Sequence, residues 1–502
     1  MHGALLVCGT TSDVGKSTLV TGLCRLLARR GVAVAPFKGQ NMSLNSMVTA
    51  EGGEIGRAQW LQAVAAGAEP EVAMNPVLLK PTSEQAAEVV VLGRAVGVEP
   101  AAHYQGAKAG LTPVVDEALA SLRSRFDVVL CEGAGSPAEI NLLRHDLVNL
   151  GLARRGGLPA ILVGDIERGG VFAHLYGTVA LLPPELAASV KGFVINRFRG
   201  DRSLLGTGPA DLEARCGVPT LGVLPDLGPL GLDAEDSLAL ERPSGPSPPA
   251  SAGLDVAAIH LPRLSNFTDL DPLAVEPGVH VRWVGRAGAL GQPDLVVLGG
   301  TRATVADLQW LRESGLASAL DALRAGPTPP VILGICGGLQ MMGSSIDDPD
   351  RVEASARTTP GLGWLRLHTV FEKEKVTRLV SAVVTDGVSV SGYEIRHGCV
   401  LPEFGRRRWF DGLERDAALS ARNVEGTVVG TTLHGLFEDD GFRSWFLSDL
   451  AARQGGDWRP SGVSYAAARE RQIDGIADAC AEHLDLERLW ELIESAAAPV
   501  HR

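Results

Sequence analysis

The sequence has no excess of basic residues, and this argues against several classes of partner. Its 502 residues contain 46 Lys and Arg against 59 Asp and Glu, which gives a formal net charge of −13. General nucleic-acid binders and membrane-surface proteins need positive charge to neutralise phosphates. We therefore expect a small-molecule partner, with no nucleic acid and no membrane, and we leave homo-oligomerisation open.

Paired cysteines and long apolar runs are also missing. The seven cysteines are scattered, odd in number and contain no CxxC pair. This spacing indicates neither a disulfide framework nor a zinc site, and it fits a reducing cytoplasm. No segment is apolar for long enough to cross a bilayer. The opening stretch MHGALLVCGT lacks the charged start and long apolar core of a signal peptide, so we expect a strand there.

The sequence is rich in short apolar runs that alternate with amphipathic stretches. Runs such as ALLVCGT, FDVVLCEGAG and LPAILVGD are typical of buried parallel strands covered by helices. At 502 residues the chain exceeds what one hydrophobic core supports. We therefore predict an α/β protein with a P-loop parallel-sheet domain over residues 1–239 and a second α/β domain over 254–455. A Pro- and Ser-rich linker is expected over 240–253 and a helical tail over 456–502.

Residues 9–18, GTTSDVGKST, follow the first apolar run and open an amphipathic helix. Glycines let backbone N–H groups wrap a phosphate, a lysine reaches the outer phosphates, and a hydroxyl can bind Mg²⁺. The strict motif has glycine six positions before the lysine, where this sequence has Thr10. The loop is therefore a longer variant, similar to that of dethiobiotin-synthetase-like ligases. We expect it to bind ATP through Gly9, Thr10, Asp13, Gly15, Lys16, Ser17 and Thr18.

Other strand ends can complete a phosphoryl-transfer site. Such a site needs a further cation near the γ-phosphate and a carboxylate for the metal. Lys38 and Glu132 each follow or end an apolar run beside the expected loop, so we assign Lys38 to the phosphate and Glu132, with Ser17, to Mg²⁺. Asn196 is a candidate contact to the nucleotide base. Each of these side chains could instead be an ordinary loop residue.

Residues 332–343, ILGICGGLQMMG, run an apolar strand into Cys336 and two glycines. A sharp turn from strand to helix exposes a nucleophile, and it needs neighbours without side chains. His434, in GTVVGTTLHGLF, is the candidate base that takes the thiol proton. The alternative is a buried structural cysteine and an unrelated histidine. Donors for an oxyanion are expected from the backbone of Gly337, Gly300 and Thr301.

With these residues the second domain resembles the class I glutamine amidotransferases. The resemblance implies a flavodoxin-like fold and a cysteine that attacks the side-chain amide of glutamine and releases ammonia. Such enzymes usually carry glutamate two residues after the histidine, where this sequence has Leu436. Glu438 and Glu394 remain as candidates for the third catalytic group. Because ammonia amidates a carboxylate only after activation, an ATP site and an ammonia source in one chain predict a glutamine-dependent amide ligase.

Five blocks are similar to those of the cobyric acid synthase family: FKGQNMSLNS, EGAGSPAEINL, GDIERGGVFAHLYGT, LSNFTDLDPL and GYEIRHG. The resemblance implies amidation of corrin side chains b, d, e and g of adenosylcobyrinic acid a,c-diamide, with glutamine, ATP and Mg²⁺. Weaker candidates for substrate contact are Asn41, Ser43 and Asn45, for which a polar loop is the equal alternative, and Asp146, which could handle the metal or the substrate. The sequence departs from the family at Arg396-His397, where His-Met is frequent, and at Thr432, where an aromatic residue is common.

Two other functions remain open from the sequence. A cobyrinic acid a,c-diamide synthase has the same two-domain plan and acts on a different pair of carboxylates. A P-loop switch ATPase joined to a degenerate amidotransferase domain would be non-catalytic, and the glutamate missing after His434 is its best support.

Overall fold

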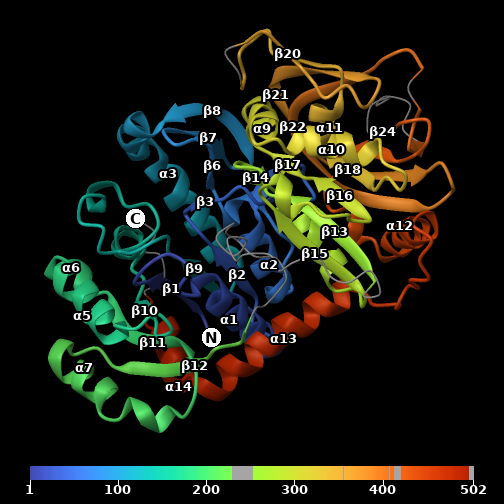
Figure 1. The fold of residues 1–502 in the computed structure, drawn as a ribbon. Coiled ribbons are helices and arrows are strands. Elements are labelled where there is room, and N and C mark those ends of the chain that lie inside the picture. Colours follow the sequence, from blue (N-terminus) through green and yellow to red (C-terminus); the bar gives the residue numbers. More distant parts are fainter. Residues whose placement is uncertain (229–252, 354–355, 406, 412–419, 497–502) are drawn as a thin grey trace.

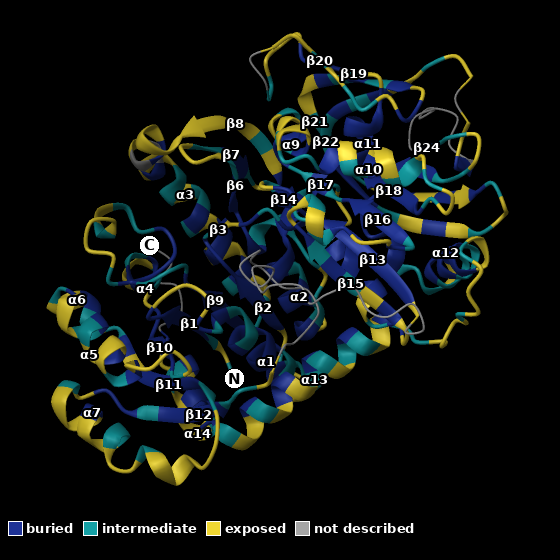
Figure 2. Ribbon diagram, in the orientation of Figure 1, coloured by how far each residue is buried: buried dark blue, intermediate teal, exposed yellow. Residues whose placement is uncertain are grey.

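The computed structural model describes residues 1–228, 253–353, 356–405, 407–411 and 420–496. In these residues the chain forms two lobes, each built around a mostly parallel sheet (Figure 1). The strands of both sheets are buried and the exposed residues lie mainly on the helices and loops around them (Figure 2). The predicted linker, residues 240–253, lies outside the described residues except for Gly253.

The N-terminal lobe contains a six-stranded parallel sheet in the order β12-β11-β10-β1-β9-β2. Its strands are the predicted apolar runs, which are buried on both faces as parallel strands usually are. They are β1 (Gly3–Gly9), β2 (Val34–Phe37), β9 (Val128–Glu132), β10 (Ala160–Asp165), β11 (Val190–Phe198) and β12 (Thr220–Pro225). The connecting helices are α1 (Lys16–Arg29), α2 (Arg57–Ala66), α3 (Ala101–Arg125), α4 (Leu150–Gly156), α5 (Val171–Leu181), α6 (Pro184–Ala187) and α7 (Gly208–Cys216).

An insertion between β2 and α3 extends this lobe toward the second one. It contains a four-stranded sheet in the order β3-β6-β7-β8 and a small hairpin of β4 and β5. Figure 1 shows this insertion beside the C-terminal lobe. Its strands are β3 (Gln40–Met42), β4 (Ser46–Val48), β5 (Glu54–Gly56), β6 (Val77–Ser83), β7 (Ala86–Val91) and β8 (Arg94–Pro100).

The C-terminal lobe has a six-stranded sheet in the order β15-β13-β16-β18-β25-β24, in which only β24 is antiparallel. Its strands are β13 (Leu254–Ile259), β15 (Val279–Val284), β16 (Leu295–Leu298), β18 (Val331–Ile335), β24 (Ser420–Arg422) and β25 (Val428–Thr431). A short pair joins β14 (Leu264–Ser265) to β17 (Gly300–Thr301). Its helices are α8 (Asp271–Ala274), α9 (Thr304–Glu313), α10 (Leu316–Arg324), α11 (Gly337–Met342) and α12 (Asp440–Arg453).

A second sheet covers this lobe and reaches back to the N-terminal insertion. It is dominated by the long antiparallel pair of β21 and β22, and the latter contacts β4. Its strands are β19 (Ser345–Asp347), β20 (Thr358–Pro360), β21 (Leu367–Val384), β22 (Ser389–Pro402) and β23 (Phe410–Asp411).

The last helices return to the N-terminal lobe. Helix α13 (Tyr465–His483) packs along α1, and α14 (Leu486–Glu494) contacts β1 (Figure 1). Ile473, Ile476 and Leu489 belong to the same apolar core as alternate residues of β1. Helices α13 and α14 are therefore part of the N-terminal lobe in space.

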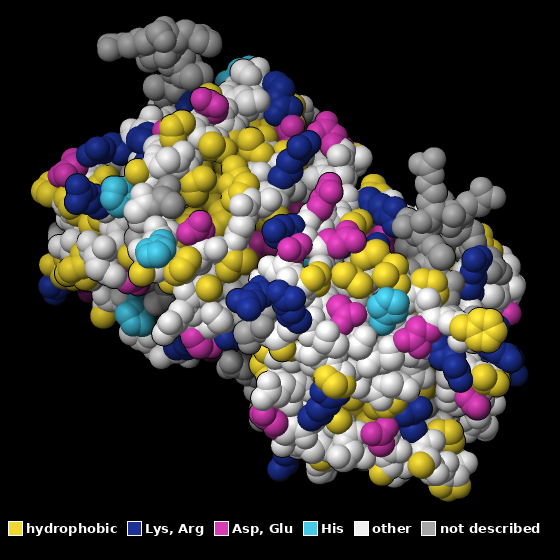
Figure 3. Space-filling view, turned by 90° about the horizontal axis from the view of Figure 1, so that it is seen from above, with side chains coloured by type: hydrophobic (Ala, Val, Ile, Leu, Met, Phe, Trp, Pro, Cys, Tyr) yellow, Lys and Arg dark blue, Asp and Glu magenta, His cyan; other side chains and the backbone are white. Residues whose placement is uncertain are grey.

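The surface agrees with the charge balance of the sequence. In the face shown in Figure 3, acidic and basic side chains are interspersed, and an apolar area lies over one lobe. Among the described residues, no helix is both long and apolar enough to cross a bilayer.

Candidate active site

The loop between β1 and α1 has the backbone of a phosphate-binding turn. Gly15 caps α1 in the left-handed region, with φ of 94°. A Cβ atom on Gly15 would lie 2.1 Å from Nδ2 of Asn196, so only glycine fits this position. Asn196 donates to the carbonyl of Val14 at 2.8 Å and so supports the loop. The sequence suggested a contact between Asn196 and the nucleotide base, whereas this contact is within the protein.

The other loop residues surround a lysine held close to the backbone. The Lys16 Nζ atom donates to the carbonyls of Thr11 at 3.0 Å and Gly135 at 3.4 Å. Asp13 pairs with Arg197 at 3.0 Å and with Arg168 at 3.6 Å. Gly9 ends β1, and Ser17 and Thr18 lie in the first turn of α1.

Glu132 is the centre of a buried cluster next to this loop. Its Oε1 atom accepts hydrogen bonds from Ser17 Oγ at 2.9 Å and from Lys38 Nζ at 2.7 Å. Its Oε2 atom accepts one from Gln62 Nε2 at 2.5 Å. The structure thus brings together Ser17, Lys38 and Glu132, as the sequence suggested. Gln62 was missed, although a glutamine within the otherwise apolar stretch WLQAVAA is a detectable signal.

The loop fits an anionic ligand on its own geometry. The Thr10 Oγ1 atom is buried and has no hydrogen-bond partner in the described structure, and a buried hydroxyl of this kind normally finds one. Within the described residues, no cluster of three or more His, Cys, Asp or Glu side chains could hold a metal alone. A cation held by Ser17 and Glu132 therefore needs further oxygen ligands, and nucleotide phosphates supply these.

In the C-terminal lobe, Cys336 occupies a strained turn between β18 and α11. Its φ of 50° and ψ of −105° are rare for a residue with a side chain, and such strain clusters at functional sites. Added Cβ atoms would lie 2.2 Å from the Met342 side chain at Gly334 and 1.9 Å from the Leu298 carbonyl at Gly338. The glycines around the cysteine are therefore required for the turn to close.

His434 follows β25, the strand beside β18, and lies against the thiol and a carboxylate. Its Nδ1 atom is 2.7 Å from Oδ2 of Asp269, and both side chains are buried. The imidazole also stacks on the ring of Tyr393, with centroids 5.5 Å apart. Neither residue is predicted from the sequence as part of the site, although both lie in family blocks, LSNFTDLDPL and GYEIRHG.

The charge state of His434 follows from these neighbours. Burial alone lowers the pKa of an imidazole, but the charge of Asp269 and the interaction with Cys336 outweigh burial and raise the pKa of His434 to about 10. The geometry therefore favours an imidazolium beside the cysteine.

The predicted oxyanion donors lie around the same thiol. A Cβ atom on Gly337 would lie 2.6 Å from Thr301 Cγ2, so the two residues are in direct contact. A Cβ atom on Gly300 would lie 2.8 Å from Cε1 of His434. The helix α11 begins at Gly337, and the N–H of Gly338 donates to the carbonyl of Gly299 at 3.1 Å, which joins the cysteine turn to the strand end beside Gly300.

The two glutamates considered from the sequence have other partners. Glu438 pairs with Arg57 of the N-terminal lobe at 2.7 Å and with Arg469 of α13 at 2.8 Å. Glu394 accepts hydrogen bonds from Arg396 at 2.9 Å and Thr432 at 2.6 Å. These contacts also account for the unusual Arg396 and Thr432, which hold a buried carboxylate together.

The side chains of the weaker substrate candidates form hydrogen bonds within the protein. Asn41 donates to Gln59 at 2.9 Å, and Ser43 and Asn45 form a local turn. The Asn45 side chain also accepts from the backbone N–H of Phe267 in the other lobe at 3.1 Å. Asp146 accepts three backbone N–H groups at the start of α4, between 2.8 and 3.0 Å.

Both lobes match families of known proteins. The model of the CobQ/CobB/MinD/ParA nucleotide-binding domain matches residues 5–232, and that of the CobB/CobQ-like glutamine amidotransferase domain matches residues 255–442. A cobyric acid synthase of Rhodococcus jostii is 53% identical, with 99% of this chain and 96% of that protein aligned. Another, from Streptomyces coelicolor, is 50% identical, with 99% and 97% aligned. The chain belongs to the cobyric acid synthase family.

Membership of the cobyric acid synthase family confirms the predicted enzyme class, an amide-forming ligase with a glutamine amidotransferase domain. It also confirms the predicted fold class, a P-loop domain followed by an amidotransferase α/β domain. The N-terminal lobe is a nucleotide-binding domain of this family.

Proposed function

We propose that the chain amidates the b, d, e and g side-chain carboxylates of adenosylcobyrinic acid a,c-diamide, with glutamine as nitrogen donor and ATP-Mg²⁺ as activator. The observation that carries the proposal is the 53% identity to a cobyric acid synthase over 99% of this chain. The same chain holds both a phosphate loop and a cysteine beside a histidine that is paired with a carboxylate. A free catalytic thiol is kept reduced in the cytoplasm, where we place the enzyme.

In the N-terminal lobe a corrin carboxylate oxygen attacks the γ-phosphorus of ATP, and ADP leaves. Lys16 and Lys38 neutralise charge on the transferred group, and backbone N–H groups of the loop hold the phosphates. Mg²⁺, when bound, supplies further positive charge, and Ser17 and Glu132 are the residues that would hold it. The product of this step is an acyl phosphate, which has a good leaving group.

In the C-terminal lobe the Cys336 thiolate attacks the carboxamide carbon of glutamine. We assign the stabilisation of the developing oxyanion to backbone N–H groups of Gly337 and of the Gly300–Thr301 segment. His434 gives its proton to the leaving nitrogen, which departs as ammonia, and water then hydrolyses the thioester to glutamate.

Ammonia from this step attacks the acyl carbon of the activated corrin, and inorganic phosphate leaves. Contacts between the lobes support a single working unit, since Arg302, next to the oxyanion segment, pairs with Glu88 of the insertion at 3.0 Å. The transfer of ammonia must also keep water from the acyl phosphate, because water would hydrolyse it.

Mass spectrometry of the corrinoid product tests this function directly. Adenosylcobyrinic acid a,c-diamide incubated with ATP, Mg²⁺ and glutamine is expected to gain four amides, which replacement of glutamine by ammonium also yields. Conversion of cobyrinic acid to its a,c-diamide would instead support the earlier synthase. Absence of any amidated product with either nitrogen source would overturn the ligase assignment in favour of the switch ATPase.

The exchange Cys336→Ser separates the two half-reactions. We expect it to abolish glutamine-dependent amidation while ammonium-dependent amidation stays near the wild-type rate, because the serine hydroxyl is a far weaker nucleophile beside this imidazole. Loss of both activities in a folded variant would contradict the role of Cys336 as the ammonia source.

A further inference from the structure

The amidotransferase site has no glutamate two residues after its histidine, yet the imidazole is not without a carboxylate. Asp269 Oδ2 lies 2.7 Å from His434 Nδ1, across 165 residues of sequence. We propose that Asp269 is the positioning residue of this site and takes the place of the glutamate that other class I amidotransferases carry beside the histidine. This inference rests on the proposed glutaminase half-reaction. It adds the carboxylate that orients His434 and the part of the fold that supplies this carboxylate.

The hydrogen bond fixes which nitrogen of the ring faces the thiol. An acidic partner at Nδ1 accepts the Nδ1–H, so the Nε2 atom remains for exchange with Cys336 and with the leaving nitrogen. The other carboxylate oxygen, Oδ1, accepts the backbone N–H of Gly435 at 2.8 Å. Both oxygens are therefore bound to the His434 segment, and the carboxylate cannot rotate away from the ring without losing both contacts.

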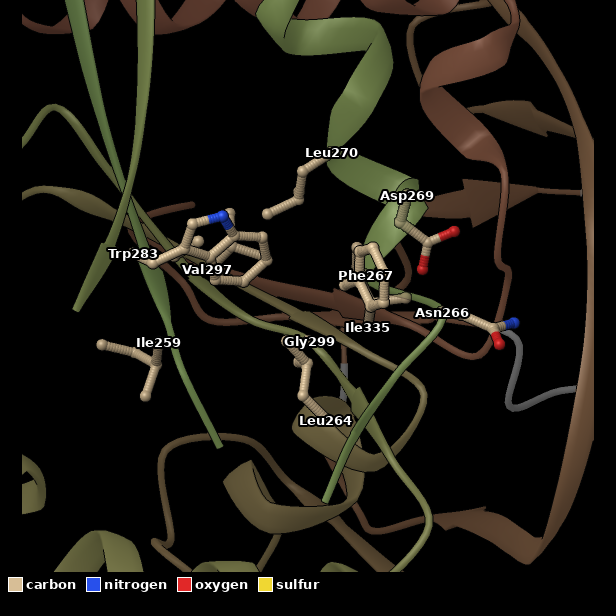
Figure 4. A pocket seen from close by; sticks show the side chains of 11 residues that line it. Ile259, Leu264, Asn266, Phe267, Asp269, Leu270, Trp283, Val297, Gly299 and Ile335 are labelled. Atoms are coloured by element: carbon tan, nitrogen blue, oxygen red, sulfur yellow. The ribbon is translucent and has the colours of Figure 1, made fainter. Parts of the chain in front are cut away.

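The surroundings hold Asp269 in a dry, rigid place. Its side chain is 4% exposed and that of His434 is 2% exposed. Figure 4 shows Asp269 and Asn266 at one side of a mostly apolar pocket, with Ile259 and Trp283 at its opposite side. In such a site a buried charge needs a partner, and the imidazolium is the one that Asp269 has.

The segment that carries Asp269 is anchored by the N-terminal lobe. Asn266, in the left-handed region with φ of 52°, accepts from the backbone N–H of Ser46 at 3.2 Å and donates to the Tyr393 hydroxyl at 3.1 Å. The next residue, Phe267, donates its N–H to Asn45 at 3.1 Å. The carboxylate that orients the histidine is thus placed by the synthetase lobe, and this explains why the histidine's own loop does not need to supply it.

The charged environment of His434 makes the proposal testable by pH. The titratable side chains that the structure places against the ring are Asp269, Cys336 and Tyr393. Neutralising Asp269 removes the strongest interaction that favours the imidazolium, so the ring should lose its proton at lower pH. A purely structural residue would not move this titration.

The test is Asp269→Asn, which keeps the shape and removes the charge. We expect glutaminase kcat, measured as glutamate release, to fall by about 100-fold or more, since the same exchange in serine proteases costs about 10⁴-fold. The alkaline limb of kcat/KM should move down by at least about one pH unit. Ammonium-dependent amidation should stay within a few-fold of wild type, which shows that the variant is folded. Asp271→Asn, two residues further along, is the matched control and should leave glutamate release unchanged.

Three outcomes would overturn the proposal. They are an Asp269→Asn enzyme with wild-type glutamate release, a loss of glutamate release with an unmoved alkaline limb, and a joint loss of glutamate release and ammonium-dependent amidation. Glutamate release is measured without a corrinoid, so this readout and its pH profile do not depend on which acid the synthetase lobe accepts. A failure of the corrinoid assay with wild-type enzyme would instead count against the proposed function.

Discussion

The two candidate sites of this chain are assembled in different ways. The phosphate site draws on one lobe only, with Lys16 and Ser17 on one turn and Lys38 and Glu132 at the ends of neighbouring strands. The thiol site takes Cys336 and His434 from neighbouring strands too, but its carboxylate, Asp269, comes from a segment pinned by the other lobe. One site is self-contained, and the other depends on how the lobes meet.

This difference has a consequence for coupling. Helix α2 reaches both places, because Gln62 contacts Glu132 at the phosphate site and Arg57 contacts Glu438 four residues after His434. The interface also contains a buried network in which Lys375 bridges Glu54 and Glu88 at 2.7 Å each. Burial alone raises the pKa of Glu54, but Lys375 and Lys80 outweigh it and lower the pKa to about 2. The lobes are therefore held by charges that stay ionised at neutral pH.

The largest expected effect comes from Lys16→Ala, which breaks the self-contained site. Removing the cation that meets the outer phosphates should lower amidation by at least about 100-fold with glutamine and with ammonium alike. Glutamate release should persist, because no thiol-site residue is touched. Product formation by mass spectrometry and glutamate release on the same samples check this. Lys191→Ala, an exposed lysine on β11, is the control and should match wild type. Undiminished product from Lys16→Ala would disprove the nucleotide role.

The next largest effect is expected in the pH dependence of the two activities, glutamate release and ammonium-dependent amidation. Because the pKa of His434 is raised from 6.5 to about 10, its charged form stabilises the folded state fully below pH 6.5, and that contribution is lost as the pH rises through about 10. The leaving nitrogen also needs this proton. We expect glutamate release to hold up to about pH 9 and to fall tenfold beyond pH 10, while ammonium-dependent amidation shows no such limb. A limb near pH 7 would mean that the imidazole has an ordinary environment.

The same contrast explains what the sequence could and could not reveal. The phosphate loop and the cysteine turn are continuous motifs whose glycines are dictated by backbone geometry, so GTTSDVGKST and ILGICGGLQ predicted both. Asp269 is one carboxylate within LSNFTDLDPL, and nothing in the local spacing says that it meets a histidine 165 residues away. That block predicted the family without indicating a role for the carboxylate. Asn41, Ser43 and Asn45 looked like ligand contacts because they are polar, yet they are buried in contacts within and between the lobes.

A smaller effect is expected from Arg57→Met, which weakens the contact between the sites. Arg57 is fully buried and bonded to Glu438 at 2.7 Å, so its loss should cost about 3 kcal/mol of unfolding free energy. Glutamate release should fall a few-fold although the residue belongs to the synthetase lobe. Arg125→Met is the matched control, because Arg125 makes a pair of equal length with Glu71 on the surface and should lose about 0.5 kcal/mol. Denaturant unfolding measures the loss of unfolding free energy in both variants. Equal losses would show that Arg57 does not couple the two sites.

The smallest expected effect is at Asp146, a residue that the sequence offered as a substrate contact. Its carboxylate accepts the backbone N–H groups of Val148, Asn149 and Gly151, which are free donors at the beginning of a helix. Asp146→Ala should therefore lower the unfolding free energy by about 1 kcal/mol and leave the KM for the corrinoid within twofold. Asp146→Asn should recover most of the stability, because an amide oxygen can accept the same bonds. A large rise in KM with unchanged stability would return Asp146 to the binding site and make the phosphate lobe less self-contained than its geometry indicates.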